Sequence, residues 1–176
     1  RLFTGQSKQG TDYIIRKKGF TPISLAKVAN CRLDAENIDE SLMQMGSTRS
    51  LENLPKRIRL GEIPFEIGKG MKACVGFNSN HGKAKARPNL VTIELGGKKY
   101  KYIAFLQVCA WAPKKIGAPL LQYSLNYDDN LVESTYVKNG VNVLDWWHAM
   151  NENQKTILNG NATWEVWSGD CGNGHD

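Results

Sequence analysis

The sequence predicts an all-β fold, a β-sandwich or a barrel. Several segments alternate apolar and polar residues with a period of two, as strands with one buried face do. Turn-forming residues separate these segments at regular spacing, and convincing helical patterns are few. The chain has 176 residues, of which 41% are hydrophobic and 23% charged, and these values suit one folded domain with a sizeable core.

The N-terminal part carries the weakest strand signals. Residues 1–19 are polar and end in a basic group, which predicts a linker or an N-terminal extension. We expect the β-sandwich domain to span residues 20–176 and to open with a strand at 20–28. Residues 30–53 are polar with few β-branched side chains, and predict a long loop with a short helix near 40–45.

Strand signals become dense from residue 57 onward. Residues 57–68 carry apolar side chains in a strand-like pattern, in which Gly61 and Pro64 mark a sheet edge or a bulge. A further short apolar run at 74–77 predicts another strand.

The middle of the chain reads as a hairpin. Residues 90–95 alternate like a half-buried strand. The Gly96–Gly97 pair then predicts a turn. It leads into residues 99–112, the most apolar run, which we expect to be a central strand buried on both faces.

A second hairpin follows. Residues 120–127 and 131–137 have strand-like patterns, and the acidic turn Asp128–Asp129–Asn130 lies between them. A turn at 138–140 then leads into the strand-like segment 141–147, VNVLDWW.

Charge and hydropathy bear on the class of partner. The net charge of +6 and the pI of about 9.1 favour acidic partners. The basic residues are dispersed in short groups, however, as on solvated loops and strand edges, so binding of nucleic acid is not expected. No apolar run approaches the roughly 20 residues that a membrane span needs.

The four cysteines are Cys31, Cys74, Cys109 and Cys171, spaced by 43, 35 and 62 residues. Without a CxxC pair, a zinc knuckle or a thioredoxin-type motif is not expected. In an oxidising compartment the cysteines allow two disulfides with three connectivities, which the sequence does not separate. Buried thiols that pack as small apolar side chains are the alternative.

The order of these segments resembles the bacterial galactose-binding-like domains, which are related to the carbohydrate-binding modules of glycoside hydrolases. The resemblance covers about residues 20–170, and five pieces carry it in order: FTPISLAKVAN at 20–30, LPKRIRLGEIPFEIG at 54–68, RPNLVTIELGGKKYKYIAFLQVCAWAP at 87–113, YSLNYDDN at 123–130 and GVNVLDWW at 140–147. It implies a two-sheet antiparallel jelly roll, found as an accessory module of larger secreted or cell-surface proteins.

Two departures from the family pattern matter. The family's Asp-Gly turn reads Asp129-Asn130 here, and asparagine tolerates a positive φ, so we expect the turn to form. The family pattern also continues past residues 162–169 with a further tryptophan-containing strand. We therefore expect a last strand that is missing, is supplied by another chain, or belongs to sequence beyond these 176 residues.

Tryptophan is the residue type that points most directly to a ligand. Sugar-binding sites stack aromatic rings on the apolar C–H faces of a pyranose, and neighbouring polar groups bind the hydroxyls. On a strand, Trp146 and Trp147 point to opposite sides, so one of them is expected in the core. The candidate ligand-binding residues are Asp145, Trp146, Trp147, His148 and Trp167.

Cofactor and catalytic signals are weak. The sequence implies no certain cofactor. Asp128 and Asp129 are the candidate ligands of a structural calcium ion, although two carboxylates in a hairpin more often form the turn itself. No nucleophile elbow, phosphate-binding loop, zinc-protease motif or dinucleotide fingerprint is present. We expect no catalysis by this domain.

The sequence thus predicts a noncatalytic ligand-binding or accessory module, with carbohydrate as its ligand. The alternative is a structural or interaction domain that completes its sheet with a partner chain or a neighbouring catalytic domain, because an unfinished sheet edge invites strand addition.

Overall fold

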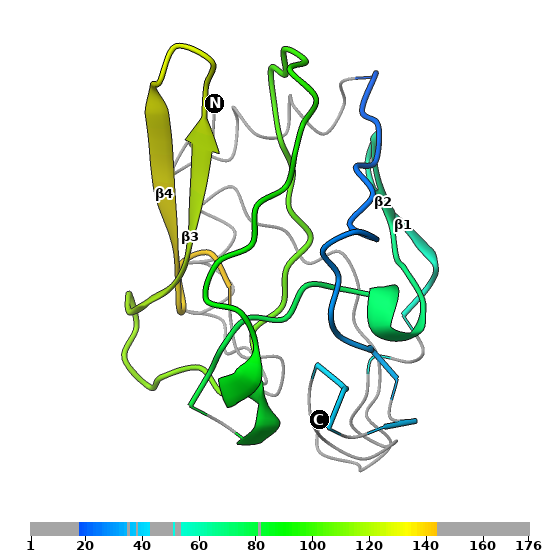
Figure 1. Cartoon of the computed structure of the whole chain (residues 1–176), viewed down its shortest axis with the longest axis vertical. Coiled ribbons are helices and arrows are strands. Elements are labelled where there is room, and N and C mark those ends of the chain that lie inside the picture. Colours follow the sequence, from blue (N-terminus) through cyan, green and yellow to red (C-terminus); the bar gives the residue numbers. More distant parts are fainter. Residues whose placement is uncertain are drawn as a thin grey trace. The chain divides into compact units, whose positions relative to one another are not determined.

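The all-β class is confirmed. The computed structural model describes residues 18–34, 36–37, 39–42, 51, 54–80 and 82–143. Within them are four strands in two antiparallel hairpins and only two short 3₁₀-helices (Figure 1). The helices are η2 at Gly70–Lys72 and η3 at Gly82–Ala86. No helix in the described ranges has the length and apolar character to cross a membrane.

The described residues group into two compact units, residues 18–94 and residues 95–143. Each unit contains one of the two hairpins. The expectation of a single domain over residues 20–176 stays a prediction, because residues 144–176 lie outside the described ranges.

The hairpin of the first unit is built from β1 at Arg57–Leu60 and β2 at Ile63–Glu66. The sequence suggested an edge or a bulge at Gly61, whereas the structure places a tight turn there, with a φ of 57° that glycine adopts without strain. Ile58 and Ile63 are the buried residues of the two strands. Their burial explains why this short hairpin forms where it does.

The rest of the first unit is held by short bridges. The expected strand at 20–28 is wrong: the chain turns there, and the N–H groups of Val28 and Ala29 both donate to the carbonyl of Leu25. The expected strand at 74–77 is reduced to one antiparallel bridge between Cys74 and Cys31. Among the residues of this unit that the structure describes, the buried apolar ones are Ala29, Cys31, Leu33, Ile58, Ile63 and Ala84.

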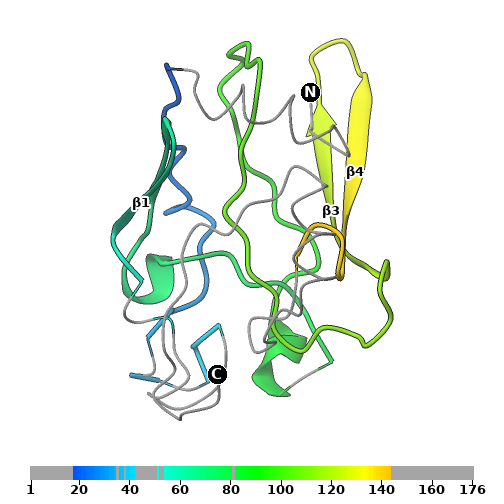
Figure 2. The same cartoon turned by 180° about the vertical axis from the view of Figure 1, so that it is seen from behind.

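The hairpin of the second unit was predicted correctly. Strand β3 at Pro119–Asn126 pairs with β4 at Val132–Lys138, with an irregularity between Pro119 and Leu121. Asn130 has the expected positive φ, 65°, and its N–H donates to the carbonyl of Tyr127 over 3.1 Å. The two strands lie side by side along their whole length in both views (Figures 1 and 2).

The central strand expected at 99–112 is not formed. This segment runs without a ladder (Figure 2), and Phe105, Leu106 and Val108 are more than a third exposed rather than buried on both faces. The strand expected at 90–95 is absent as well, although Gly96 and Gly97 form the predicted turn with φ values of 69° and 64°. An alternating pattern predicts which side chains share a face of a strand. It does not identify a neighbouring strand whose backbone groups would complete the hydrogen bonds.

Polar contacts fix the ends of the second hairpin. The buried side chain of Asn139 donates to the carbonyl of Pro113 over 2.6 Å, and its backbone N–H donates to the carbonyl of Ala118. The turn predicted at 138–140 forms, and the N–H of Gly140 donates to the carbonyl of Val143 over 2.8 Å. The described part of the segment 141–147 ends at Val143.

Candidate functional site

The tryptophan-centred candidates lie outside the described residues. Nothing in the structure therefore tests them, and they stay a prediction; they are Asp145, Trp146, Trp147, His148 and Trp167.

The acidic turn between β3 and β4 lies within the described part and acts as a turn former. A carboxylate oxygen of Asp129 accepts a hydrogen bond from the N–H of Leu131 over 3.1 Å. This local bond is the usual role of aspartate in a turn. Among the described residues, no group of three or more His, Cys, Asp or Glu side chains is arranged to hold a metal ion. A calcium ion at Asp128 and Asp129 stays a prediction.

The β3–β4 hairpin presents two chemically different faces. One face turns away from solvent and packs Tyr123 against the ring of Phe105, with ring centroids 3.8 Å apart and an interplanar angle of 16°. The Tyr123 hydroxyl donates to the side-chain carbonyl of Gln107 over 3.1 Å. Burial raises the pKa of Tyr123 to about 12. This packing fixes which side of the hairpin is left to solvent.

The opposite side, here called the outer face, is exposed at every position. Across the ladder it pairs Gln122 with Tyr136, Ser124 with Ser134 and Asn126 with Val132. The Tyr136 side chain is 52% exposed, so its ring is open to a ligand. The outer face therefore combines one accessible aromatic ring with a row of amide and hydroxyl groups.

Hydrogen bonds order the polar groups of the outer face. The hydroxyls of Ser124 and Ser134 lie 2.8 Å apart across the two strands. The Gln122 side-chain amide donates to the Ser124 hydroxyl over 3.3 Å. These contacts restrict three side chains before any ligand arrives, which lowers the entropy lost on binding.

Trp111 is a second accessible aromatic residue of the same unit. Its side chain is 51% exposed, and its φ of 60° is unusual for a bulky residue. Such backbone outliers concentrate at functional sites. Trp111 is one of five tryptophans in the chain, and nothing in the sequence pattern around it predicts a positive φ.

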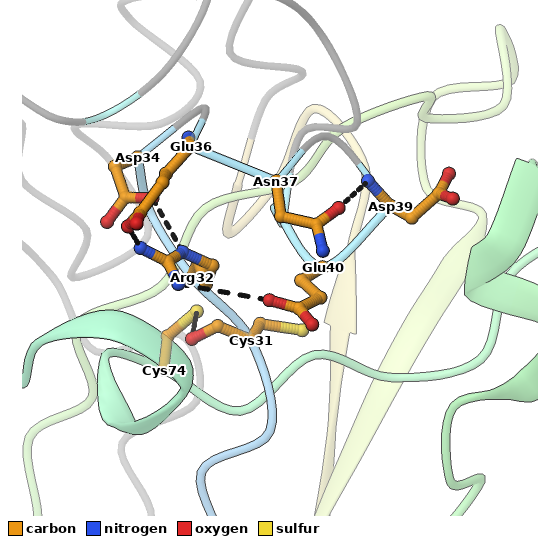
Figure 3. A network of polar contacts seen from close by, with 8 residues as sticks. All are labelled: Cys31, Arg32, Asp34, Glu36, Asn37, Asp39, Glu40 and Cys74. Atoms are coloured by element: carbon orange, nitrogen blue, oxygen red, sulfur yellow. Dashed lines mark hydrogen bonds and ion pairs between the residues drawn. The ribbon is translucent and has the colours of Figure 1, made fainter.

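The first unit holds an ion network around Arg32 (Figure 3). The guanidinium binds a carboxylate oxygen of Asp34 over 2.7 Å, and it also pairs with Glu36 and, over 3.8 Å, with Glu40. The hydrogen bond that Arg32 donates to Asp34 is the main cause that raises the pKa of Arg32. One guanidinium holds three carboxylates here, so the cluster ties a loop together, and among the described residues these carboxylates are not arranged to hold a metal ion.

Sequence reasoning missed the outer face for a clear reason. On β4 the alternation does not decide between the two sides, because Val132 and Tyr136 lie on one side and Val137 lies on the other. The stack of Tyr123 on Phe105 decides the orientation, and that contact spans 18 residues of sequence.

Comparison with models of protein families, with curated proteins and with solved structures gave no match. The resemblance to galactose-binding-like domains therefore stays a prediction.

Proposed function

We propose that this chain is a noncatalytic ligand-binding or accessory module of a larger secreted or surface bacterial protein, and that its ligand is a carbohydrate. The observation that carries the proposal is the exposed ring of Tyr136 on the outer face, beside the polar side chains of Gln122, Ser124 and Ser134.

This combination suits a sugar. The Tyr136 ring offers an apolar surface for the C–H face of a pyranose. The amide of Gln122 provides a donor and an acceptor, and the serine hydroxyls provide both as well. Because a hairpin face is open and nearly flat, it accommodates one or two units of a longer chain rather than a small molecule enclosed in a pocket.

The finer architecture belongs to the same proposal. The two antiparallel hairpins support a two-sheet sandwich of the jelly-roll type. In this proposal, Asp145, Trp146, Trp147, His148 and Trp167 remain a second group of candidate ligand-binding residues besides those of the outer face. Both groups are tested below.

The experiment is a glycan-array screen of the intact chain followed by calorimetric titration of the best ligand. Tyr136→Ala should weaken binding about tenfold or more, about 1.4 kcal/mol, because the stacking surface is lost. Tyr100→Ala is the matched control: this tyrosine belongs to the same unit and is 40% exposed, but it lies outside the outer face.

Each outcome separates the alternatives. Unchanged affinity in Tyr136→Ala with a loss in Trp146→Ala or Trp147→Ala would move the site to the tryptophan group. Absence of binding to every glycan by the intact chain would contradict the carbohydrate proposal as a whole.

A partner-binding role is the second candidate. Within the described residues each strand pairs with a single neighbour, and Leu131 and Val132 beside the β3–β4 turn are strongly exposed. An available strand edge next to apolar side chains favours strand addition by another chain. Light scattering after size exclusion tests this role, and a monomer at all concentrations would argue against pairing between copies.

A further inference from the structure

Cys31 and Cys74 lie opposite each other across an antiparallel bridge, and the Cys74 thiol donates to the carbonyl of Cys31 over 3.8 Å (Figure 3). The N–H of Cys31 donates to the carbonyl of Cys74 over 3.2 Å, and the N–H of Cys74 donates to the carbonyl of Cys31 over 3.3 Å. Residues that exchange both hydrogen bonds have Cα atoms about 5.5 Å apart. That spacing falls within the range of disulfide-bonded cysteines.

Neighbouring contacts hold this geometry. The N–H of Asn30 also donates to the carbonyl of Cys74, over 3.0 Å. The Asn30 side chain in turn bonds both backbone groups of Gly76. A β-carbon at Gly76 would overlap the Cys31 sulfur, so the absence of a side chain there leaves room for the thiol. The two cysteines are therefore aligned by the backbone and not by chance contact of side chains.

The surroundings favour a thiolate within the pair. The hydrogen bond from the Cys74 thiol, aided by the charge of Arg87, lowers the pKa of Cys31 to about 7. The same hydrogen bond and burial raise the pKa of Cys74. The Arg87 guanidinium is fixed by the carbonyls of Ser41 and Leu42, over 2.7 and 3.5 Å. Because the two sulfurs share one proton near neutral pH, the pair carries one negative charge and can act as a nucleophile.

We propose that Cys31 and Cys74 form a redox site that closes to a disulfide when it meets a small disulfide oxidant such as oxidised glutathione. Cys31 is fully buried, whereas Cys74 is partly exposed, so Cys74 is the sulfur that the oxidant reaches.

The reaction proceeds by two exchanges. Cys31 is the favoured thiolate of the pair, so the Cys74 thiol first passes its proton to Cys31. The resulting Cys74 thiolate attacks one sulfur of oxidised glutathione and forms a mixed disulfide, and one glutathione thiolate leaves. Cys31 then gives up its proton and attacks the Cys74 sulfur, and the second glutathione leaves. Two protein thiols are oxidised to one disulfide, while one glutathione disulfide is reduced to two thiols.

The disulfide would join segments that are 43 residues apart in sequence. Crosslinking a loop of that length restricts the unfolded chain, so the oxidised protein should have a Tm higher by roughly 5–10 °C. Four cysteines allow three disulfide connectivities, and the Cys31–Cys74 disulfide is compatible with one of them. In that connectivity Cys109 and Cys171 either form the second disulfide or stay reduced.

The test is incubation of the full chain with oxidised glutathione, alkylation of remaining thiols, denaturation and tryptic digestion without reductant. Each cysteine falls in its own tryptic peptide, 28–32, 73–83, 102–114 and 156–176, so mass spectrometry identifies every pairing. The expected product is peptide 28–32 joined to peptide 73–83, together with the rise in Tm.

Two variants sharpen the result. Cys31→Ser should stop the reaction at the mixed disulfide and leave Cys74 carrying one glutathione. Cys109→Ser, in the other unit, should leave the 28–32 to 73–83 link unchanged. The proposal is overturned if Cys31 remains alkylated after oxidation of the wild type, if it pairs with Cys109 or Cys171, or if the linked protein melts at or below the reduced one.

Discussion

The carboxamide of Asn30 forms a pair of hydrogen bonds with Gly76: its oxygen accepts from the Gly76 N–H over 2.7 Å, and its nitrogen donates to the Gly76 carbonyl over 3.0 Å. The side chain thus behaves as an extra peptide unit that extends the bridge between Cys31 and Cys74. Among the described residues of this unit the only ladder is four residues long, so much of their order depends on such single contacts.

We expect Asn30→Ala to lower the free energy of unfolding by about 2 kcal/mol, because two hydrogen bonds are lost and the peptide groups of Gly76 lose partners in a partly buried place. Urea unfolding measures the change. Asn126→Ala, at an exposed position of β3, is the control and should stay within about 0.5 kcal/mol of the wild type. Equal effects of the two substitutions would contradict the role of Asn30.

Gly76→Ala should destabilise the chain by about 1–3 kcal/mol, because the added methyl group overlaps the Cys31 sulfur and crowds Arg87. A double-mutant cycle with Cys31→Ala isolates the contact. Removing the sulfur should recover most of the loss in the double variant. If the two losses simply add, the methyl group is not in conflict with Cys31.

Tyr123 should make stability depend on pH in the alkaline range. Its pKa is about 12 in the folded chain, against about 10 when unfolded, so the folded state holds the proton more tightly. Tyr123 therefore contributes to the free energy of unfolding through its bound proton. This contribution is fully present below about pH 10 and is lost as the pH rises through about 12, with a slope of up to about 1.4 kcal/mol per pH unit. Urea unfolding of the wild type and Tyr123→Phe measures it.

The variant should be less stable at neutral pH, because the bond to Gln107 is lost, and should lose less stability above pH 10. Tyr136→Phe, at an exposed position of the same hairpin, is the control and should be as stable as the wild type at neutral pH. If the free energy of unfolding depends on pH in the same way for the wild type and Tyr123→Phe, then Tyr123 is not the group that causes the loss of stability.

At the β3–β4 turn, Asn130→Gly should change the free energy of unfolding by less than about 0.5 kcal/mol, whereas Asn130→Val should cost about 1–2 kcal/mol. The reason is the φ of 65°, which glycine and asparagine tolerate and a β-branched side chain does not. Thermal unfolding compares the three proteins. If Asn130→Val leaves the free energy of unfolding unchanged, the turn relaxes to another geometry.

The sequence was a good guide where structure is local. Alternation on both sides of Asp128–Asp129–Asn130 predicted β3, the turn and β4, because each strand's partner lies only a few residues away. The pair Gly96–Gly97 predicted its own turn for the same reason. The segment 99–112 was misjudged because its apolar content indicates burial but does not supply a strand to pair with.

The candidate surfaces were harder to predict. The side of the hairpin that meets solvent is decided by the stack of Tyr123 on Phe105, and the alignment of Cys31 with Cys74 is decided by bonds from Asn30 to Gly76. These contacts join residues 18 and 46 positions apart, beyond the reach of any periodic pattern.

The ion network of Arg32 has a consequence for proteolysis. A trypsin-like protease must draw an arginine side chain into its specificity pocket, and Arg32 is held by Asp34, Glu36 and Glu40 with its side chain only 16% exposed. Cleavage after Arg32 therefore requires local opening of this loop first. In the native chain, such a protease should cleave faster after exposed basic residues. Arg57, with 84% of its side chain exposed, is one of them.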